Sequence, residues 1–528
     1  MNKKKTSENI ITLPTDLIND IKALGLDKTK QSHAFKFVYL VLRDSYMNHE
    51  NYISYSSKSQ KFITKVFDKN YNSWLRPLKE AEIIICDNQY SNGTNKSFYY
   101  AINSKYFTGE INYDSILKID CEAYKDVIKN INENDSIIGE YLENDLSELY
   151  INYDKLEAIS RNMARSISIE DFKVNEQINR NTFELFTYNG TKLGSYYTSK
   201  EKAIEKANEL GKIIIKSNQK VYMMDETEFL NAKKASVYTY HMDCINKMNA
   251  KKFRFGINTT NNRLDHNLTN MPTELVNEIC RDNNLIQLDL SNSQFALLCM
   301  LLNTELDTDD FKAFRELATS GQLYESMMNK LCLESRDEAK TAMFELLFSS
   351  QSMKSEGKTK LRELYPSVID WIDQYKTENG YQAFSVMLQL KESEIFVEKL
   401  WKTIKEKGLF CLSRHDSLIY KKENQNEIET LVTEYFNEIG LRCNLKLSDG
   451  RKIQIAGEMD SNTSKTDIVY SIDELKIMLR DLKNHREYNG VKSAIGMLID
   501  TIDTKTVEEA NLHYWHFKNK DYLEMFKR

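Results

Sequence analysis

Residues 284–302 read NLIQLDLSNSQFALLCMLL and change character twice along their length. The short apolar run at 285–288 has the length and composition of a buried strand, and it ends at Asp289. A polar turn follows, and the apolar stretch after it is long enough for a helix. The segment therefore predicts a strand that places a carboxylate at its end and leads directly into a helix.

Three further segments carry candidate chemistry in a fixed order along the chain: FRFGINTTNNRLDHNLTNMP (253–272), SRDEAKTAMFELLFSS (335–350) and GLFCLSRHDSLIYKK (408–422). The segment at 335–350 predicts a helix, and four of its side chains recur every fourth residue and so share one face: Arg336, Lys340, Phe344 and Phe348. In 408–422, two runs typical of strands flank His-Asp-Ser. This pattern predicts a hairpin with Asp416 at its turn.

Together these residues indicate phosphate chemistry. Asp289 and Asp416 could converge on two divalent cations, because Mg²⁺ prefers carboxylate and phosphate oxygens. Two such ions can stabilise the attacking and the leaving oxygens of an in-line displacement. A helix that presents Arg336 and Lys340 one turn apart suits a triphosphate, and the aromatic faces beyond them suit base stacking.

In order and spacing, the segments resemble the polymerase domain of family A DNA polymerases and of the related single-subunit phage-type RNA polymerases. LDLSNSQ (288–294) is similar to the first palm motif of that family, Asp-x-Ser-x-x-Glu. The four side chains at 336–348 match the fingers-helix motif, and His-Asp-Ser at 415–417 matches the second palm motif. NRLDHNLTNMP (262–272) resembles the stretch that precedes the first palm motif, and Gln389 lies where the family has a helix glutamine. The resemblance covers roughly 200 residues.

The resemblance implies a role for each matching residue. Asp289 and Asp416 hold two Mg²⁺ ions, with Mn²⁺ as an alternative, and Lys340 can protonate the pyrophosphate that leaves. The nucleotide-binding residues are Arg336, Lys340, Phe344, Phe348, Gln294 and Ser291. The residues implied to contact nucleic acid, including the primer end, are Arg263, His266, Gln389 and His415.

Three departures from the family concern the choice of sugar. Gln294 replaces a glutamate that crowds the ribose 2′ position in DNA polymerases, and Phe348-Ser349 replaces a Tyr-Gly pair. Since the glutamate and the tyrosine are partners in the family, their joint loss predicts a repacked sugar pocket. Ser417 is the form of the motif found in the RNA-polymerase branch. The choice between deoxynucleotides and ribonucleotides stays open, with deoxynucleotides favoured.

The region before residue 250 resembles no proofreading domain. Residues 32–107 have the helix, helix, strand, glycine turn and strand order of a winged helix, with the turn at 91–95 and serines at 54–57 as helix-cap candidates. Phosphate contacts could come from six basic side chains: Lys58, Lys61, Lys65, Arg76, Lys79 and Lys96. A small protein-contact domain with a solvated lysine face is the alternative.

The expected fold is helix-rich α+β, with a right-hand palm, fingers and thumb and an N-terminal winged-helix-like domain. The expected divisions are 1–115 (winged-helix-like), 116–250 (helical thumb or connector with a small α/β patch), 251–458 (palm and fingers) and 459–528 (helical extension). The 528-residue chain has a net charge of −6, so nucleic-acid contacts must be local. It has no apolar run that could span a membrane, and its eight scattered cysteines indicate reduced thiols in a cytoplasmic protein.

The function expected from these features is template-directed DNA polymerisation without proofreading, in a phage, plasmid or other mobile element. Nucleic acid and nucleoside triphosphates are the expected partners. One alternative is an RNA polymerase or a primase-like nucleotidyltransferase, including one that needs no template. Another is a non-catalytic replication initiator that binds DNA and has a degenerate palm.

Overall fold

The computed structural model describes residues 8–47, 56–86, 98–109, 116–120, 136–172, 185–189, 193, 200–217, 220–350, 355–456, 476 and 479–480. One compact unit comprises Met1–Asn437 and Leu441–Ala456, and a second comprises Glu438–Gly440 and Gly457–Arg528. Helices dominate the described residues and several small sheets accompany them, which confirms the α+β class. The helical extension expected at 459–528 lies almost entirely outside the described residues. No described helix is both long and apolar enough to cross a membrane.

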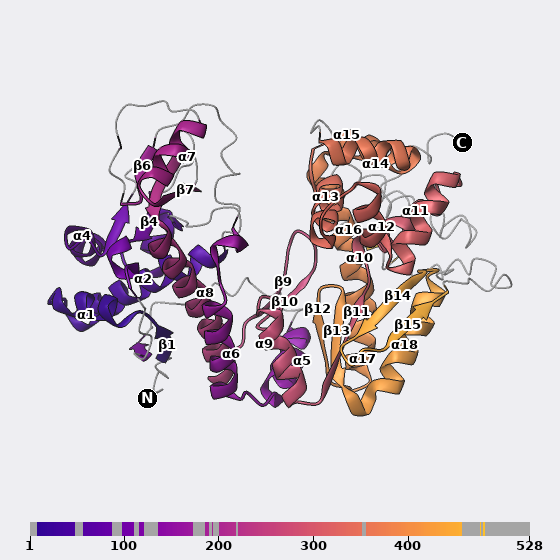
Figure 1. Ribbon diagram of the computed structural model, residues 1–528. Helices are drawn as coiled ribbons and strands as arrows, with labels where there is room; N and C mark the ends of the chain where they lie inside the picture. Colours follow the sequence, from indigo (N-terminus) through magenta and orange to yellow (C-terminus); the bar gives the residue numbers. More distant parts are fainter. Residues whose placement is uncertain are drawn as a thin grey trace. The chain divides into compact units, whose positions relative to one another are not determined.

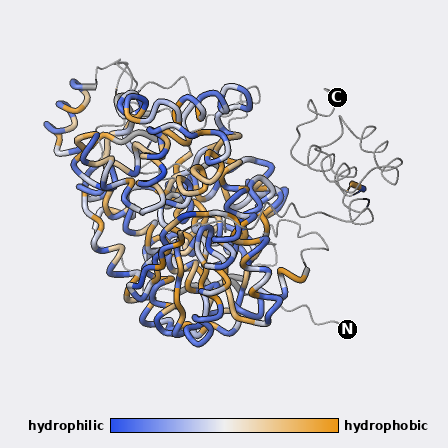
Figure 2. The backbone as a smooth tube through the Cα atoms, turned by 90° about the vertical axis from the view of Figure 1, so that its right-hand side faces the viewer, coloured by the Kyte–Doolittle hydropathy of each residue, from blue (hydrophilic) through white to orange (hydrophobic). Residues whose placement is uncertain are grey.

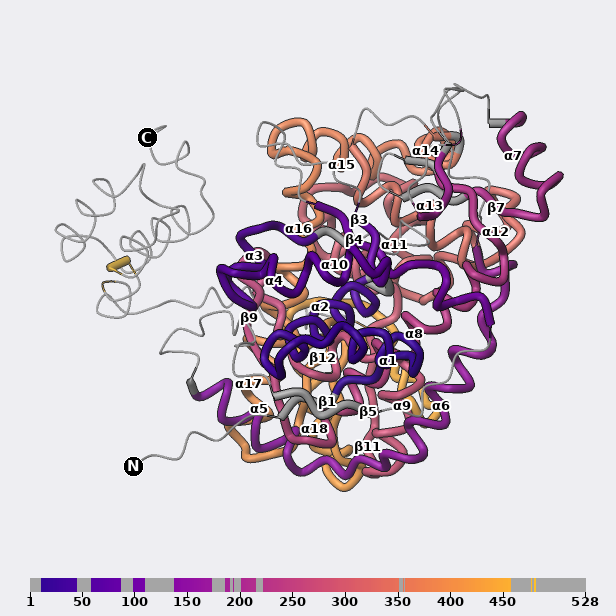
Figure 3. Tube along the Cα trace, turned by 90° about the vertical axis from the view of Figure 1, so that its left-hand side faces the viewer, coloured from indigo at the N-terminus to yellow at the C-terminus, as the bar shows by residue number. Residues whose placement is uncertain are grey.

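The N-terminal part of the chain packs helices against a three-stranded antiparallel sheet ordered β2-β4-β3. Its elements are α1 (Thr15–Ala23), α2 (Lys28–Met47), β2 (Ser56–Lys58), α3 (Gln60–Val66), α4 (Asn72–Glu80), β3 (Ile84–Cys86) and β4 (Phe98–Ile102). Figure 3 shows these helices in indigo, with the left-hand side of Figure 1 facing the viewer. The Phe37 ring lies 5.5 Å from the Trp74 ring and 5.1 Å from the Tyr100 ring, at the centre of the core.

Several sequence predictions can be compared with this part. The antiparallel strand pair is confirmed by β3 and β4, while its turn at 91–95 lies outside the described residues. Of the cap candidates at 54–57, Ser56 and Ser57 instead lie in the strand Ser56–Lys58, while residues 54–55 lie outside the described residues. Ser59 caps α3 by accepting a hydrogen bond from the Phe62 N–H at 3.0 Å. A polar serine run can serve either role, because edge strands are also polar.

The basic residues of this part are less available to a phosphate than the sequence suggests. Lys58 is buried and paired with Asp44, so the expectation that it contacts phosphate is wrong. Arg76 is paired with Glu80, and the Lys79 ammonium lies over the rings of Phe98 and Tyr100. DNA docking by this part of the chain stays a prediction.

The connecting region contains two more small sheets and a long helix. β1 (Glu8–Thr12) pairs antiparallel with β5 (Ile116–Asp120), and β6 (Leu185–Thr187), β8 (Lys220–Asp225) and β7 (Lys212–Ser217) form a sheet in that order. β7 and β8 pair antiparallel. The helices and turns here are η2 (Ser104–Phe107), α5 (Ser136–Glu148), α6 (Tyr153–Arg165), η4 (Ile169–Asp171), α7 (Lys200–Glu209) and α8 (Glu226–Asn249). Asp225 caps α8, because its carboxylate accepts hydrogen bonds from the N–H groups of Thr227 and Glu228.

Asp145 fastens α5 to α17 (Lys402–Glu406) through a buried ion pair and to the strand β12 (Cys411–Arg414) through a hydrogen bond. The Lys405 ammonium lies 2.7 and 2.6 Å from the two carboxylate oxygens of Asp145, and both side chains are buried. The Cys411 N–H also donates to the Asp145 carboxylate, at 3.2 Å. Three hydrogen bonds to one carboxylate offset much of the cost of removing the two charges from water.

A five-stranded antiparallel sheet, ordered β12-β13-β11-β14-β15, forms the centre of the region after residue 250 (Figure 1). Its other strands are β11 (Leu285–Leu290), β13 (Ser417–Lys421), β14 (Cys443–Leu447) and β15 (Lys452–Ile455). The neighbouring elements are β9 (Phe255–Ile257), β10 (Leu264–His266), α9 (Thr273–Asp282), the π-helix η5 (Glu394–Trp401), α17 (Lys402–Glu406), η6 (Lys422–Asn424) and α18 (Gln425–Glu438). Leu288, Leu418 and Phe436 are fully buried in this layer.

A separate helical cluster follows β11 in the chain. It consists of α10 (Ser293–Leu302), α11 (Asp309–Ser320), α12 (Leu323–Lys330), α13 (Arg336–Phe348), α14 (Glu356–Leu364), α15 (Pro366–Asn379) and α16 (Tyr381–Ser393), which share one apolar core. Apolar and hydrophilic stretches alternate along the coloured backbone in Figure 2. The Lys376 ammonium donates to the carbonyls of Leu346 and Ser349, at 2.6 and 2.8 Å, and so caps the C-terminal end of α13.

Candidate active site

Asp289 lies near the end of β11, the central strand of the five-stranded sheet. It pairs with Ser417 of β13 on one side and with Lys446 of β14 on the other. The other residues of β11 are buried, whereas Asp289 is partly exposed. The predicted strand, its terminal carboxylate and the helix that follows are confirmed by β11 and α10.

Asp416 lies in the turn between β12 and β13, which confirms the predicted hairpin. Arg414 pairs with Ser417, so His415 and Asp416 form a two-residue turn, and His415 has a φ of 58°. A positive φ at the first turn residue is typical of such hairpins. The Leu290 N–H donates to the Asp416 carbonyl at 3.1 Å. The two aspartates are thus brought to the same end of two adjacent strands.

The surroundings of Asp289 disfavour its negative charge. Burial raises the pKa of Asp289 above its ordinary value, and the charge of Asp416 adds to the rise. A hydrogen bond from the Gln287 amide to the Asp289 carboxylate, at 2.9 Å, acts in the opposite direction but does not cancel it. A bound cation would relieve the cost of holding the Asp289 carboxylate ionised in this buried, negatively charged setting.

The helix predicted at 335–350 is confirmed by α13. Three of the side chains predicted to share one face of this helix contact one another in sequence. The Lys340 ammonium lies 5.8 Å from the centre of the Phe344 ring. The Phe344 and Phe348 rings are stacked, with centres 5.4 Å apart and planes 7° from parallel. Phe348 is 36% exposed, while Phe344 packs against Phe295 of α10. Lys340, Phe344 and Phe348 therefore form a continuous row that ends in an accessible aromatic ring.

Arg336, at the start of the same helix, is engaged by α12. Its guanidinium is paired with Glu325 at 2.8 Å and lies over the Tyr324 ring, 5.0 Å from its centre. Burial raises the pKa of Tyr324 to about 12, with the charge of Arg336 lowering it and that of Asp416 raising it. Tyr324 is therefore within electrostatic range of both. Among the described residues, no hydrogen bond or ion pair joins Lys340 to either aspartate.

A buried carboxylate that the sequence analysis missed lies close to this site. Glu392 of α16 is 1% exposed, and it receives two hydrogen bonds from the Arg263 guanidinium at 2.8 and 2.9 Å. The Gln294 amide also donates to Glu392. Burial raises the pKa of Glu392 to about 7 against the opposing effect of Arg263, and the charge of Asp416 contributes to the rise. Arg263, Gln294 and Glu392, here called the Glu392 network, therefore lie within electrostatic range of Asp416.

Gln294 has a polar partner within this network, because its side-chain amide donates to the Glu392 carboxylate of α16. Gln389, one turn before Glu392 on α16, accepts a hydrogen bond from Asn261 at 2.9 Å. The spacing of three residues from Gln389 was the one available sequence signal for Glu392, because it places both on the same side of α16.

His266 does not have the environment expected of a nucleic-acid contact. It is fully buried, and its Nε2 lies 2.7 Å from the Ser413 carbonyl of β12. Burial lowers the pKa of His266 to about 4, so the ring is neutral near pH 7. His266 therefore supports the hairpin that carries His415 and Asp416, and its contact with nucleic acid stays a prediction.

Several buried polar atoms around the aspartates lack a hydrogen-bond partner among the described residues. They are Gln287 Oε1, Ser291 Oγ, Gln294 Oε1 and His415 Nδ1. Buried polar groups are nearly always satisfied in folded proteins, so each such atom calls for an explanation. Their gathering near one pair of carboxylates indicates a site that binds a polar ligand.

The raised pKa of Asp289 leads to a prediction about stability. The native state holds this proton more tightly than the unfolded chain, so ionisation of Asp289 destabilises the fold as pH rises through the ordinary aspartate range. Without divalent cations, Asp289→Asn should therefore raise the midpoint of thermal unfolding at pH 7 relative to the wild type. Mg²⁺ should raise the midpoint of the wild type more than that of the variant.

Asp449, in the β14–β15 turn, provides the control. Slight burial favours its protonated form, but hydrogen bonds from Arg451 outweigh this effect and lower the pKa of Asp449. Asp449→Asn should therefore fail to raise the unfolding midpoint. An equal gain from the two substitutions would contradict the electrostatic account of Asp289.

The Glu392 network leads to a second prediction. Arg263→Ala would leave Glu392 buried without its cation, which typically costs about 3–5 kcal/mol in unfolding free energy. Adding Glu392→Gln should recover part of that loss, because no buried charge then remains. Urea unfolding of the wild type, of Arg263→Ala and Glu392→Gln singly, and of the double variant measures both effects. A loss from the double variant equal to the sum of the two single losses would show that the pair is not coupled.

No protein-family model matches this chain, and no curated protein matches its sequence. The chemistry of the site is therefore inferred from its own residues. These are two carboxylates on adjacent strands, a helix with a cation and stacked rings, and a group of buried polar atoms without partners.

Proposed function

We propose that the chain is a template-directed nucleic-acid polymerase that joins nucleotides by two-metal-ion nucleotidyl transfer. The observation that carries the proposal is the convergence of Asp289 and Asp416 on adjacent strands, within electrostatic range of a tyrosine that Arg336 also contacts. In this proposal the five-stranded sheet is the palm and the helices from α10 to α16 are the fingers. A primer–template nucleic acid and nucleoside triphosphates are the partners.

The residues of the site fit a pair of Mg²⁺ ions, which Asp289 and Asp416 would hold. Carboxylate oxygens are the donors that Mg²⁺ prefers, and the raised pKa of Asp289 is a cost that a cation removes. No group of three or more His, Cys, Asp and Glu within the described residues could hold a metal. Substrate phosphates and water are the usual further ligands of Mg²⁺ held by one or two carboxylates. When bound, the ions stabilise charge on the attacking and leaving oxygens.

The reaction proposed for this site is the extension of a strand by one nucleotide. The 3′-hydroxyl oxygen of the strand bonds to the α-phosphorus of the triphosphate, and the bond from that phosphorus to pyrophosphate breaks. Arg336 and Lys340 supply positive charge to the triphosphate. Lys340 donates a proton to the leaving pyrophosphate, and the hydroxyl proton passes to water. Phe348, exposed at the end of the aromatic row, offers a face on which a base can stack.

An RNA polymerase or primase-like enzyme is the second candidate, and the state of Gln294 favours it. The Nε2 of Gln294 is bound to Glu392, whereas its Oε1 is a buried acceptor without a partner within the described residues. Such an acceptor gains most from a hydroxyl donor, and a ribose 2′-hydroxyl is one. The sequence favours deoxynucleotides, so the two candidates differ in a property that can be measured.

We expect Asp289→Asn and Asp416→Asn each to reduce primer extension by at least about 100-fold, because charge that develops in the transition state would lose its stabilising cation. Asp449→Asn, in a turn of the same sheet, should extend primers at the wild-type rate. The measurement is the single-turnover rate with labelled dNTPs or NTPs on primed DNA and RNA templates. Extension by either active-site variant at the wild-type rate would refute the mechanism. Wild-type protein that binds no nucleotide in the presence of Mg²⁺ or Mn²⁺ would favour the non-catalytic initiator.

Substitution of Gln294 should change the choice of sugar. If Gln294 Oε1 accepts a hydrogen bond from a 2′-hydroxyl, Gln294→Leu should lower kcat/KM for NTPs about tenfold and leave that for dNTPs nearly unchanged. If Gln294 excludes the ribose instead, the same variant should gain activity with NTPs. Gln374→Leu, at an exposed position of α15, is the matched control.

A further inference from the structure

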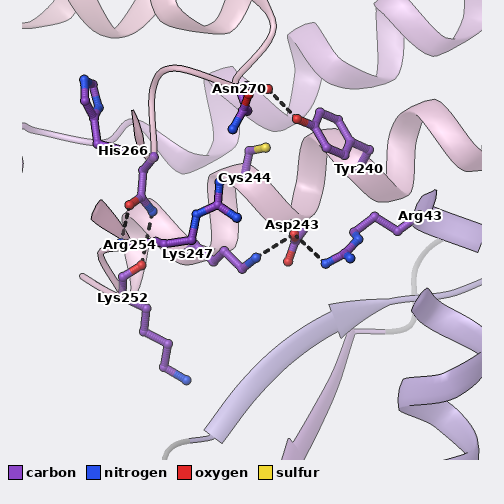
Figure 4. Close-up of a pocket in the computed structure, with 10 residues that line it drawn as sticks. Arg43, Tyr240, Asp243, Cys244, Lys247, Lys252, Arg254, His266 and Asn270 are labelled. Atoms are coloured by element: carbon purple, nitrogen blue, oxygen red, sulfur yellow. Dashed lines mark hydrogen bonds and ion pairs between the residues drawn. The ribbon is translucent and has the colours of Figure 1, made fainter. Parts of the chain in front are cut away.

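A pocket of about 160 Å³ lies outside the site described above, between the C-terminal half of α8 and the β9–β10 hairpin (Figure 4). One residue of α2, Arg43, also lines it. This volume leaves room for an anion of the size of one phosphate group.

The pocket carries more positive than negative charge. Four of its side chains are cations and one is an acid: Arg43, Lys247, Lys252, Arg254 and Asp243. Burial would raise the pKa of Asp243, but the charges of Lys247 and Arg43 outweigh it and lower the pKa, so Asp243 is an anion near neutral pH. His266 is neutral there, since its pKa is lowered to about 4. Burial also raises the pKa of the Cys244 thiol to about 12.

The cations are arranged unequally around the single acid. The Lys247 ammonium lies 2.8 Å from an Asp243 carboxylate oxygen, and an Arg43 guanidinium nitrogen lies 3.8 Å from the same oxygen. Within the described residues, the Arg254 guanidinium makes no hydrogen bond or ion pair. In Figure 4 the Arg254 side chain lies on the same side as Lys247, whereas the Lys252 side chain extends away from the group.

The backbone that carries Arg254 is held in place by the hairpin. The Arg254 N–H donates to the Asn267 side-chain oxygen at 2.6 Å, and the Asn267 amide donates to the Lys252 carbonyl at 3.1 Å. On the opposite wall, the Tyr240 hydroxyl donates to the Asn270 carbonyl. The main partner of Arg43 is Asp44, whose carboxylate lies 2.8 Å from the Arg43 guanidinium. An unpaired Arg254 guanidinium on a fixed backbone, next to Lys247, is suited to bind an anion.

A single buried side chain links this pocket to the proposed catalytic hairpin. His266 lines the pocket and contacts the Ser413 carbonyl of β12, two residues before His415. An anion held here would therefore lie at a fixed distance from Asp416. A strand that filled the pocket with one of its phosphates would be positioned relative to the site of extension.

We propose that this pocket binds one phosphate group of a nucleic-acid strand, with Arg254 and Lys247 as its principal cations. The nature of the anion follows from the pocket alone. Only the identity of its carrier, a nucleic-acid strand, rests on the proposed function. The role is positioning, because the pocket holds no reacting group.

The test uses the full chain and two probes. The first is inorganic phosphate, compared with chloride at matched ionic strength in thermal unfolding. Phosphate should raise the unfolding midpoint of the wild type more than that of Arg254→Ala. Because Arg254 is exposed and has no side-chain partner within the described residues, the substitution should leave the fold intact. An equal effect of phosphate on both proteins would overturn the anion site.

The second probe is a fluorescently labelled DNA duplex, titrated without nucleotides or divalent cations over a range of NaCl concentrations. Loss of one phosphate contact should reduce the slope of log K against log[salt] by about 0.9, which corresponds to binding about eightfold weaker at 0.1 M salt. Arg254→Ala should show both changes. Arg165→Ala, at the C-terminal end of α6, is a matched arginine control and should show neither.

The two probes separate the proposals. A phosphate effect on the unfolding midpoint, together with an unchanged salt slope in Arg254→Ala, would overturn the nucleic-acid carrier. Gln374→Leu, which is outside both the pocket and the candidate active site, should bind the duplex as the wild type does. If the wild type extends no primer while Arg254→Ala still weakens duplex binding, the proposed function fails and the pocket assignment stands.

Discussion

The antiparallel pairing of β11 with β13 is the constraint on which the candidate site depends. Asp289 is opposite Ser417, so Asp416 in the preceding turn lies beside it, although more than a hundred residues of chain separate the two. Because side chains alternate between the faces of a strand, a slip of one residue would turn Asp289 to the opposite face. The buried residues around it make such a slip costly, since they would be moved to the wrong side of the sheet.

The parts of this site that could be predicted from the sequence are those with local causes. The strand before Asp289, the hairpin turn at Asp416 and the face shared by Lys340, Phe344 and Phe348 follow from apolar runs, turn chemistry and helical periodicity. These patterns involve only a few neighbouring residues. These local patterns are sufficient to predict the shared face of the helix and the turn of the hairpin.

The parts that could not be predicted depend on partners far away in the chain. Glu392 reads as one acid among several in LKESE, and only the fold gives it Arg263 and Gln294. His266 resembled a polar loop residue until its burial against β12 was known. The prediction that Lys58 contacts phosphate is wrong for the same reason: its ammonium is paired with Asp44, and the sequence does not reveal this pairing. Burial and pairing of charges are tertiary properties, and composition carries little information about them.

The β9–β10 hairpin contacts the Glu392 network, the strand that leads to the Asp416 turn and the cationic pocket, which are far apart in the sequence. Arg263 fixes it to α16 through Glu392, and His266 fixes it to β12. Asn267 orders the segment that carries Arg254 at the pocket. A displacement of this hairpin would therefore disturb the Glu392 network, the support of the Asp416 turn and the cationic pocket together.

The ion pair between Lys405 and Asp145 has a consequence for how the chain can be divided. Residues 251–458 include all the residues of the candidate site. A fragment with these bounds would therefore be an obvious choice for biochemical experiments. Such a fragment would lack α5, and its Lys405 would be left in the interior with only the Leu409 carbonyl as an acceptor. The backbone N–H of Cys411, in the strand that leads to Asp416, would lose its acceptor at the same cut. A shortened chain that keeps this ion pair must therefore begin upstream of residue 136, so that α5 is retained.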